Sequence, residues 1–154
     1  MKQNKKNLVF LADDDADDRE FFENVCLEVT DSVSCRTFID GTFLMDYLKV
    51  PGNPSPDIIF LDINMPKKNG LQCLEEIKKT KDLAELCTIM YSTSNHPQDI
   101  RKSYMLGANG FVQKPHSYTD LKEILKRIFD TDWSDPCNAL DELNFVLKPE
   151  GEYK

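Results

Sequence analysis

The sequence predicts an α/β fold in which a parallel sheet lies between helices on both of its faces. Short apolar runs of strand length alternate along the chain with longer segments whose apolar residues recur at helical spacing. These short runs are apolar throughout, which is typical of strands that are buried on both faces of a sheet. Parallel strands need helical crossovers between them, and such crossovers are right-handed in nearly all proteins.

Five segments have the composition of buried strands, and each is four to six residues long. In chain order they are residues 8–12, 33–38, 58–61, 87–91 and 110–113. Residues 51–56, with the sequence Pro-Gly-Asn-Pro-Ser-Pro, form the clearest loop, because proline and glycine end regular structure.

Five helices are expected between and after these strands. The first and third span residues 15–29 and 70–80, and the second carries its apolar residues at 43–48 and stops before Pro51. Pro97 suits the first turn of the fourth helix, which follows Asn95 or His96 as cap and ends near Gly107. The fifth helix is capped by Ser117, and its apolar stripe is formed by Leu121, Ile124, Leu125 and Ile128.

Polar side chains follow four of the five expected strands directly. They are Asp13-Asp14-Asp15, Asp62, Ser92-Thr93 and Lys114. The carboxyl ends of parallel strands share one edge of a sheet, and ligands bind at that edge. The sequence therefore predicts one acidic pocket that requires a cation and has a single lysine beside it.

The acidic residues of this pocket have the composition of a metal site. Asp13, Asp14 and Asp62 cannot all stay ionised at close range unless a positive charge offsets them. A hard cation with few protein oxygen ligands, such as Mg²⁺, would do so, and Asn64 could add its backbone carbonyl. The alternative is that the aspartate triplet only caps the first helix, although one acid suffices for a cap.

The lysine and the hydroxyl residues have the chemistry to bind an anion. Pro115 keeps Lys114 out of helical geometry, so its ammonium stays at the strand end, where it can pair with an anion at Asp62. Ser92 and Thr93 could donate a hydroxyl and a backbone N–H to an oxyanion. The alternative interpretations are a surface lysine before a turn and two residues that form a turn.

Composition excludes several other classes of protein. The 154 residues are enough for one domain, and the net charge of −8 argues against a nucleic-acid partner, since phosphate binding needs a basic face. The five cysteines form no C-x-x-C pair, which favours a reduced, cytoplasmic protein over a disulfide framework. The N-terminal apolar run is too short for a signal peptide or a membrane span.

Over residues 7–129 the chain resembles the receiver domains of bacterial two-component response regulators. The matching motifs are Asp13-Asp14, Asp62-Ile63-Asn64-Met65-Pro66 with Gly70, Ser92-Thr93 and Lys114-Pro115, and Ser92 and Lys114 follow Asp62 by 30 and 52 residues. The resemblance implies a flavodoxin-like three-layer sandwich with strand order 2-1-3-4-5. The loop at residues 51–56 is similar to that of stand-alone receivers that partner phytochrome-like or other hybrid kinases.

The resemblance also implies residue roles at the acidic end of the pocket. Asp62 would be the phosphoacceptor, taking a phosphoryl group from a sensor histidine kinase or a histidine phosphotransfer protein. Asp14 would ligate Mg²⁺ directly, Asp13 directly or through water, and Asn64 through its carbonyl. The protein would catalyse only its own phosphorylation and dephosphorylation.

On the anion-binding side, the resemblance assigns the contacts with the phosphoryl oxygens. Ser92 would contact a phosphoryl oxygen, as would the backbone N–H of Thr93, and Lys114 would pair with another. Phe111 occupies the position of the aromatic that changes rotamer on activation, together with Ser92. The receiver would span residues 7–130 and act as a monomer or weak homodimer.

Residues 131–154 form an extension that is too short for a usual DNA-binding output domain. Asp135-Pro136 is typical of a helix start, and Leu140, Leu143 and Leu147 could form one apolar stripe. We expect a short helix packed on the receiver, or alternatively an element that docks a partner. A protein target, rather than nucleic acid or membrane, is therefore expected.

Two other functions use similar residues. A haloacid-dehalogenase-type phosphatase also has a strand-end aspartate nucleophile and Mg²⁺, and the aspartate triplet contains its D-x-D spacing. Ala16-Asp17 stands where that family usually has Gly-Thr, and no glycine-rich nucleotide-binding motif follows the first strand. A degenerate receiver that signals by binding alone is the third possibility, and the intact acid, hydroxyl and lysine set argues against it.

Overall fold

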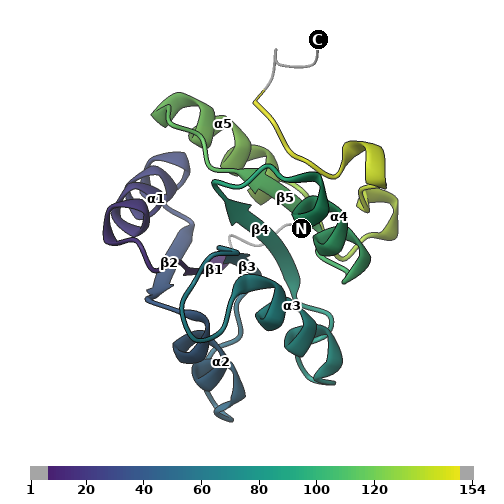
Figure 1. Ribbon diagram of the computed structural model, residues 1–154. Helices are drawn as coiled ribbons and strands as arrows, with labels where there is room; N and C mark the ends of the chain where they lie inside the picture. Colours follow the sequence, from purple (N-terminus) through teal and green to yellow (C-terminus); the bar gives the residue numbers. More distant parts are fainter. Residues whose placement is uncertain (1–6, 150–154) are drawn as a thin grey trace.

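The computed structural model describes residues 7–149, and it has the predicted parallel sheet (Figure 1). The strand order is β2-β1-β3-β4-β5, and all four pairings are parallel. This confirms the flavodoxin-like order 2-1-3-4-5. The strands are β1 (Asn7–Ala12), β2 (Val33–Phe38), β3 (Ile58–Leu61), β4 (Cys87–Ser92) and β5 (Gly110–Gln113).

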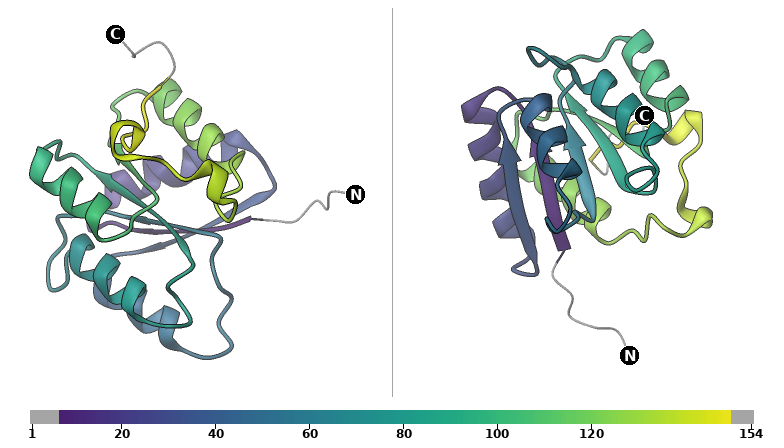
Figure 2. Two further views of the ribbon diagram at one scale, coloured as in Figure 1. Left: turned by 90° about the vertical axis from the view of Figure 1, so that its right-hand side faces the viewer. Right: turned by 90° about the horizontal axis from the view of Figure 1, so that it is seen from below.

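Five helices cover the two faces of this sheet, which makes three layers (Figure 2). Helices α1 and α5 pack together on one face, and α2, α3 and α4 cover the other. Their bounds are α1 (Ala16–Val29), α2 (Gly41–Lys49), α3 (Gly70–Lys79), α4 (Pro97–Met105) and α5 (Tyr118–Phe129). The predicted element boundaries therefore differ from the observed ones by only one or two residues.

Each face of the sheet has its own hydrophobic core, because successive strand residues point to opposite faces. Val9 and Leu11 of β1 contribute to the core under α1 and α5, whereas Phe10 contributes to the other. Aromatic rings form the centre of the core under α1 and α5, where the ring centroids of Phe22 and Phe60 lie 4.9 Å apart. Each large apolar side chain buried in this way contributes about 1.5–3 kcal/mol to stability.

The helix starts follow local capping chemistry. Asp15 is the N-cap of α1, and its side chain accepts hydrogen bonds from the backbone N–H groups of Asp17 and Asp18. Ser117 caps α5 as predicted, and His96 precedes Pro97 of α4 without a side-chain cap bond. One aspartate of the triplet therefore serves the helix, and two remain for another role.

The C-terminal extension contains two short 3₁₀ helices, η1 (Pro136–Asn138) and η2 (Glu142–Asn144). The first begins at Asp135-Pro136 as predicted, with Asp135 as its cap, but it is a single turn. The predicted apolar stripe is wrong, since Leu143 is 95% exposed. We refer to residues 131–149 as the C-terminal tail.

The tail ends as a strand-like segment against the edge of β5. The Phe111 N–H donates to the Phe145 carbonyl at 3.0 Å, and the Leu147 N–H donates to the Phe111 carbonyl at 2.8 Å. Phe145 is 1% exposed and lies against Tyr104 of α4, with ring centres 5.3 Å apart. The tail therefore pairs the backbone of an edge strand that would otherwise lie open to other chains.

Among residues 7–149, no helix is both long and apolar enough to cross a membrane.

We predict that the tail contributes to the stability of the domain. Phe145→Ala should lower the free energy of unfolding by about 3–5 kcal/mol, because it leaves a cavity beside Tyr104. The control is Leu143→Ala, which removes an exposed side chain and should change stability by less than about 0.5 kcal/mol. Denaturant unfolding measures both values, and equal effects would mean that the tail is not docked in solution.

Candidate functional site

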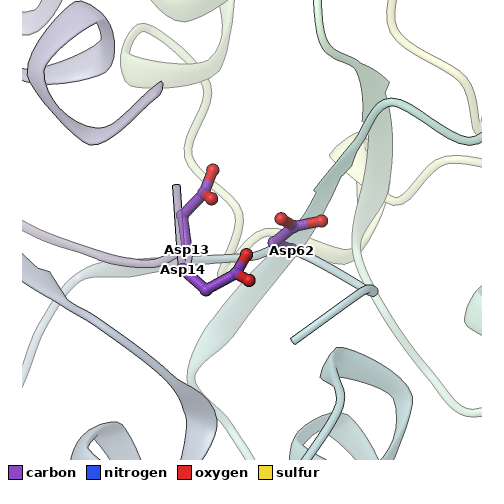
Figure 3. A group of neighbouring side chains, drawn as sticks. All are labelled: Asp13, Asp14 and Asp62. Carbon is purple, nitrogen blue, oxygen red and sulfur yellow. The ribbon is translucent and has the colours of Figure 1, made fainter. Parts of the chain in front are cut away.

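Three carboxylates meet at the carboxyl edge of the sheet. Asp13 and Asp14 follow β1, Asp62 follows β3, and oxygen atoms of all three lie within 4.8 Å of one another (Figure 3). Asp13 and Asp62 are buried, whereas Asp14 is exposed. The cluster therefore has one side open to solvent, through which an ion can enter.

The ladder hydrogen bonds of the sheet hold the backbone of this cluster. The Asp13 N–H donates to the Phe38 carbonyl of β2, and the Asp62 N–H donates to the Ala12 carbonyl of β1, both at 3.0 Å. At Gly70, the first residue of α3, a Cβ atom would lie 2.2 Å from the Asp62 carbonyl oxygen. Only glycine lets α3 approach the acceptor strand this closely.

The two oxygens of Asp13 have different partners. Oδ1 accepts the Asp15 N–H at 3.0 Å. Oδ2 is buried, and its partner is the ammonium of Lys114, with Nζ at 2.7 Å. A buried carboxylate oxygen that is held only by an ion pair can also ligate a divalent cation, which prefers oxygen ligands.

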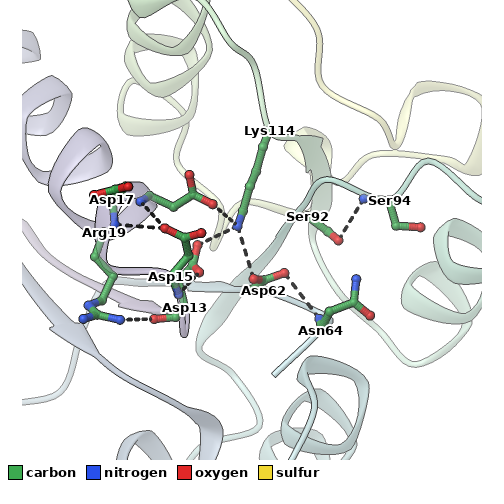
Figure 4. Close-up of polar contacts among 10 residues, drawn as sticks. Asp13, Asp15, Asp17, Arg19, Asp62, Asn64, Ser92, Ser94 and Lys114 are labelled. Atoms are coloured by element: carbon green, nitrogen blue, oxygen red, sulfur yellow. Dashed lines mark hydrogen bonds and ion pairs between the residues drawn. The ribbon is translucent and has the colours of Figure 1, made fainter. Parts of the chain in front are cut away.

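Lys114 supplies the positive charge of the site (Figure 4). Its Nζ lies 2.7 Å from Asp13, 2.8 Å from Asp18 and 3.2 Å from Asp62, and its side chain is only 8% exposed. Burial by itself would lower the pKa of Lys114, but the close carboxylates outweigh it and raise the pKa above its usual value. The ammonium therefore stays charged.

Burial has the opposite effect on the acceptor candidate. Desolvation by burial raises the pKa of Asp62; Lys114 lowers it and the charge of Asp13 raises it, and together these effects bring it to about 6. The Asn64 N–H donates to Asp62 Oδ1 at 3.3 Å, and Lys114 donates to Oδ2 at 3.2 Å. Asp62 is thus a carboxylate held by one donor on each oxygen.

The hydroxyl residues lie at the same edge, where β4 ends. Ser92 is buried and its Oγ accepts the Ser94 N–H at 3.2 Å, so the hydroxyl hydrogen is available to donate elsewhere. Thr93 is exposed next to it. The Ser92 carbonyl accepts the Lys114 N–H at 2.8 Å, which fixes β4 and β5 in register beneath the site.

The predicted switch residue lies one layer deeper. Phe111 is fully buried on the α4 face of the sheet and pairs with Met90 of β4. Its backbone is the part of β5 that the tail holds through Phe145 and Leu147. The sequence did not predict this contact, because nothing local marks residues 145–147 as a strand partner.

A family model of the response regulator receiver domain matches residues 9–126. The chain belongs to the response regulator receiver family. Members of this family are generally phosphoacceptors in two-component signalling, and they interact with histidine kinases or phosphotransfer partners. The family is therefore the one that the sequence motifs predicted.

Known proteins of the family resemble this chain over most of its length. Response regulator Rcp1 of Synechocystis sp. is 29% identical over 131 residues, covering 82% of this chain and 89% of Rcp1. The crystal structure of the Mn²⁺-bound form of Rcp1 has a TM-score of 0.71 at 28% identity, covering 84% of this chain and 96% of that one. That relative binds a divalent cation, and the acidic cluster here is suited to one.

A second solved relative is the phosphorylated cyanobacterial phytochrome response regulator RcpA. Its TM-score is 0.73 at 32% identity, and the match covers 79% of this chain and 90% of that one.

We predict that a divalent cation stabilises the fold through the acidic cluster. Mg²⁺ or Mn²⁺ should raise the melting temperature, because ion binding relieves the repulsion among three carboxylates; at 100 times Kd the gain is about 2.7 kcal/mol. Asp14→Ala should lose most of this response, whereas Asp17→Ala, outside the cluster, should keep it. If Asp14→Ala keeps the full rise in melting temperature, the aspartate triplet does not bind the ion and serves only to cap helix α1.

Proposed function

We propose that this chain is a single-domain response regulator that takes a phosphoryl group onto Asp62. The observation that carries the proposal is the position of Asp62, a buried carboxylate that pairs with Lys114 and shares the acidic cluster with Asp13 and Asp14. The family match over residues 9–126 favours this function over a haloacid-dehalogenase-type phosphatase. The phosphoryl donor is a phosphohistidine of a sensor histidine kinase or phosphotransfer protein.

In the proposed reaction, one oxygen of Asp62 attacks the phosphorus of the phosphohistidine. The P–N bond breaks, its electron pair returns to the imidazole nitrogen, and Asp62 becomes an acyl phosphate. A loose phosphoryl transition state gains mainly from alignment and charge neutralisation. Lys114 supplies a fixed positive charge 3.2 Å from Asp62 Oδ2.

The proposed cofactor is Mg²⁺, held by Asp13, Asp14, Asp62 and the carbonyl of Asn64. When bound, it neutralises charge on the phosphoryl oxygens and helps align them. Ser92 and the backbone N–H of Thr93 contact a further phosphoryl oxygen from the β4 side, because β4 ends at Ser92 on the same sheet edge.

For the output we propose that phosphorylation changes the face formed by α4, β5 and α5. A phosphoryl group adds about −1.5 to −2 charges beside Lys114 and Ser92. Drawing Ser92 toward it opens space under residues 94–97, into which Phe111 can turn. Phe111 also pairs with the tail, so the tail lies on the surface that a cytoplasmic protein target would contact.

We predict that acetyl phosphate with Mg²⁺ adds one phosphoryl group to the chain, at Asp62. Asp62→Asn should abolish this labelling, because the amide is not a nucleophile, and Asp46→Asn, an exposed acid on α2, should label normally. Mass spectrometry of the intact protein measures both. Undiminished labelling of Asp62→Asn would reject the acceptor assignment, and no labelling of the unaltered protein would indicate a degenerate receiver. Repeated turnover of p-nitrophenyl phosphate would instead favour a phosphatase.

We predict that the output signal reaches the tail. Beryllofluoride, a phosphoryl mimic, should shift the amide signals of α4, of β5 and of residues 145–147, because Phe111 links the site to the tail. Asp62→Asn, which offers no carboxylate to the mimic, is the control and should show no such shifts. Changes confined to the loops around Asp14, Asp62 and Lys114 would show that this face does not carry the signal.

A further inference from the structure

A fourth carboxylate reaches the lysine of the site from helix α1. Asp18 Oδ2 lies 2.8 Å from Lys114 Nζ, although the two residues are 96 positions apart in the sequence. An acid in the first turn of a helix is usually explained by the helix dipole and lies in solvent. The Asp18 side chain is instead 37% exposed and points across to the end of β5.

The lysine has as many donors as it has carboxylate neighbours. An ammonium group carries three N–H bonds. Three carboxylate oxygens surround Nζ, from Asp13 at 2.7 Å, Asp18 at 2.8 Å and Asp62 at 3.2 Å. The position of the ammonium is therefore set by three partners on three separate segments, at the ends of β1 and β3 and in α1.

This inference rests on the proposed function, in which two of these partners take up a new group: Asp13 the cation and Asp62 the phosphoryl group. Asp13 belongs to the cluster that would hold the cation, so its carboxylate would be shared between the lysine and the ion. Asp62 becomes an acyl phosphate and exchanges its own carboxylate charge for that of the phosphoryl group. Asp18 is neither in the acidic cluster nor the acceptor, so its charge and its contact with the lysine do not depend on the cation or on the phosphoryl group.

We propose that Asp18 is a positioning residue that holds the Lys114 ammonium over the acceptor throughout the phosphorylation cycle. A lysine side chain has four rotatable methylene groups and loses much freedom when it is fixed. The carboxylate on α1 fixes it before the phosphoryl group arrives. Asp18 thereby also connects the start of α1 to the loop after β5.

The test is beryllofluoride binding to the full chain at saturating Mg²⁺, measured by titration calorimetry. Asp18→Ala should bind about 3- to 10-fold more weakly, the loss expected for a partly exposed charged contact. Asp18→Asn keeps an oxygen that can accept from the lysine and should recover most of the affinity. Asp17→Ala removes the same charge from the same turn, has no contact with Lys114 among the described residues, and should bind normally.

A double-mutant cycle separates positioning from a general effect on the helix. In a Lys114→Ala background, Asp18→Ala should cause no further loss of affinity, because its partner is already gone. A loss that persists there, or an Asp18→Ala protein that binds as well as or better than the unaltered one, overturns the proposal. The second result would mean that Asp18 mainly repels the bound anion.

A measurement without the mimic distinguishes this inference from the proposed function. With Mg²⁺ alone, the Lys114 ammonium protons should give an observable NMR signal in the unaltered protein and in Asp17→Ala, and should exchange too fast to be seen in Asp18→Ala. A signal that is unchanged in Asp18→Ala overturns the positioning role. Failure of the unaltered protein to bind beryllofluoride would reject the proposed function alone, since the ammonium signal still reports on Asp18.

Discussion

The ion pairs around Lys114 are the interaction on which the rest of the site depends. The chain places several acids at one sheet edge, and burial there raises the pKa of Asp62 to about 6 even with Lys114 beside it. Without that positive charge, the buried acids would repel one another or become protonated. The lysine lowers the pKa of Asp62 and so favours its ionised form, which is the form of this side chain that can act as a nucleophile or ligate a metal ion.

The sheet makes this arrangement possible because parallel strands bring their carboxyl ends to the same edge. The backbone of Asp13 and of Asp62 is fixed by hydrogen bonds to the neighbouring strands, and the Lys114 backbone is fixed to Ser92 in the same way. The charged groups are thus held by residues whose backbone is bonded into the sheet. Ser92 and Phe111, the proposed switch residues, lie on β4 and β5, the two strands nearest the tail.

The C-terminal tail shows how an edge strand can be covered without a further helix. Strand β5 is the last strand of the sheet, and its outer backbone groups would otherwise face solvent or another chain. Phe145 and Leu147 pair the N–H and the carbonyl of Phe111 and add apolar side chains to the cores on both faces of the sheet. The edge next to the predicted switch residue is therefore occupied by the chain itself, and any partner at β5 must contact or displace the tail.

The sequence by itself determined the strands and helices of the sheet domain, the helix starts at Asp15 and Ser117, and the polar residues at the strand ends, because all of these depend on neighbours a few positions away. The strand order came from the resemblance to receivers, since periodicity does not specify which strands are adjacent. Only the tertiary structure revealed Asp18 and the docked tail. Asp18 has the local signature of a helix-start acid, and its partner is 96 residues distant. The leucines of the tail have helical spacing, but the open backbone of β5 and the space beside Tyr104 favour an extended segment, and neither can be recognised before the chain is folded.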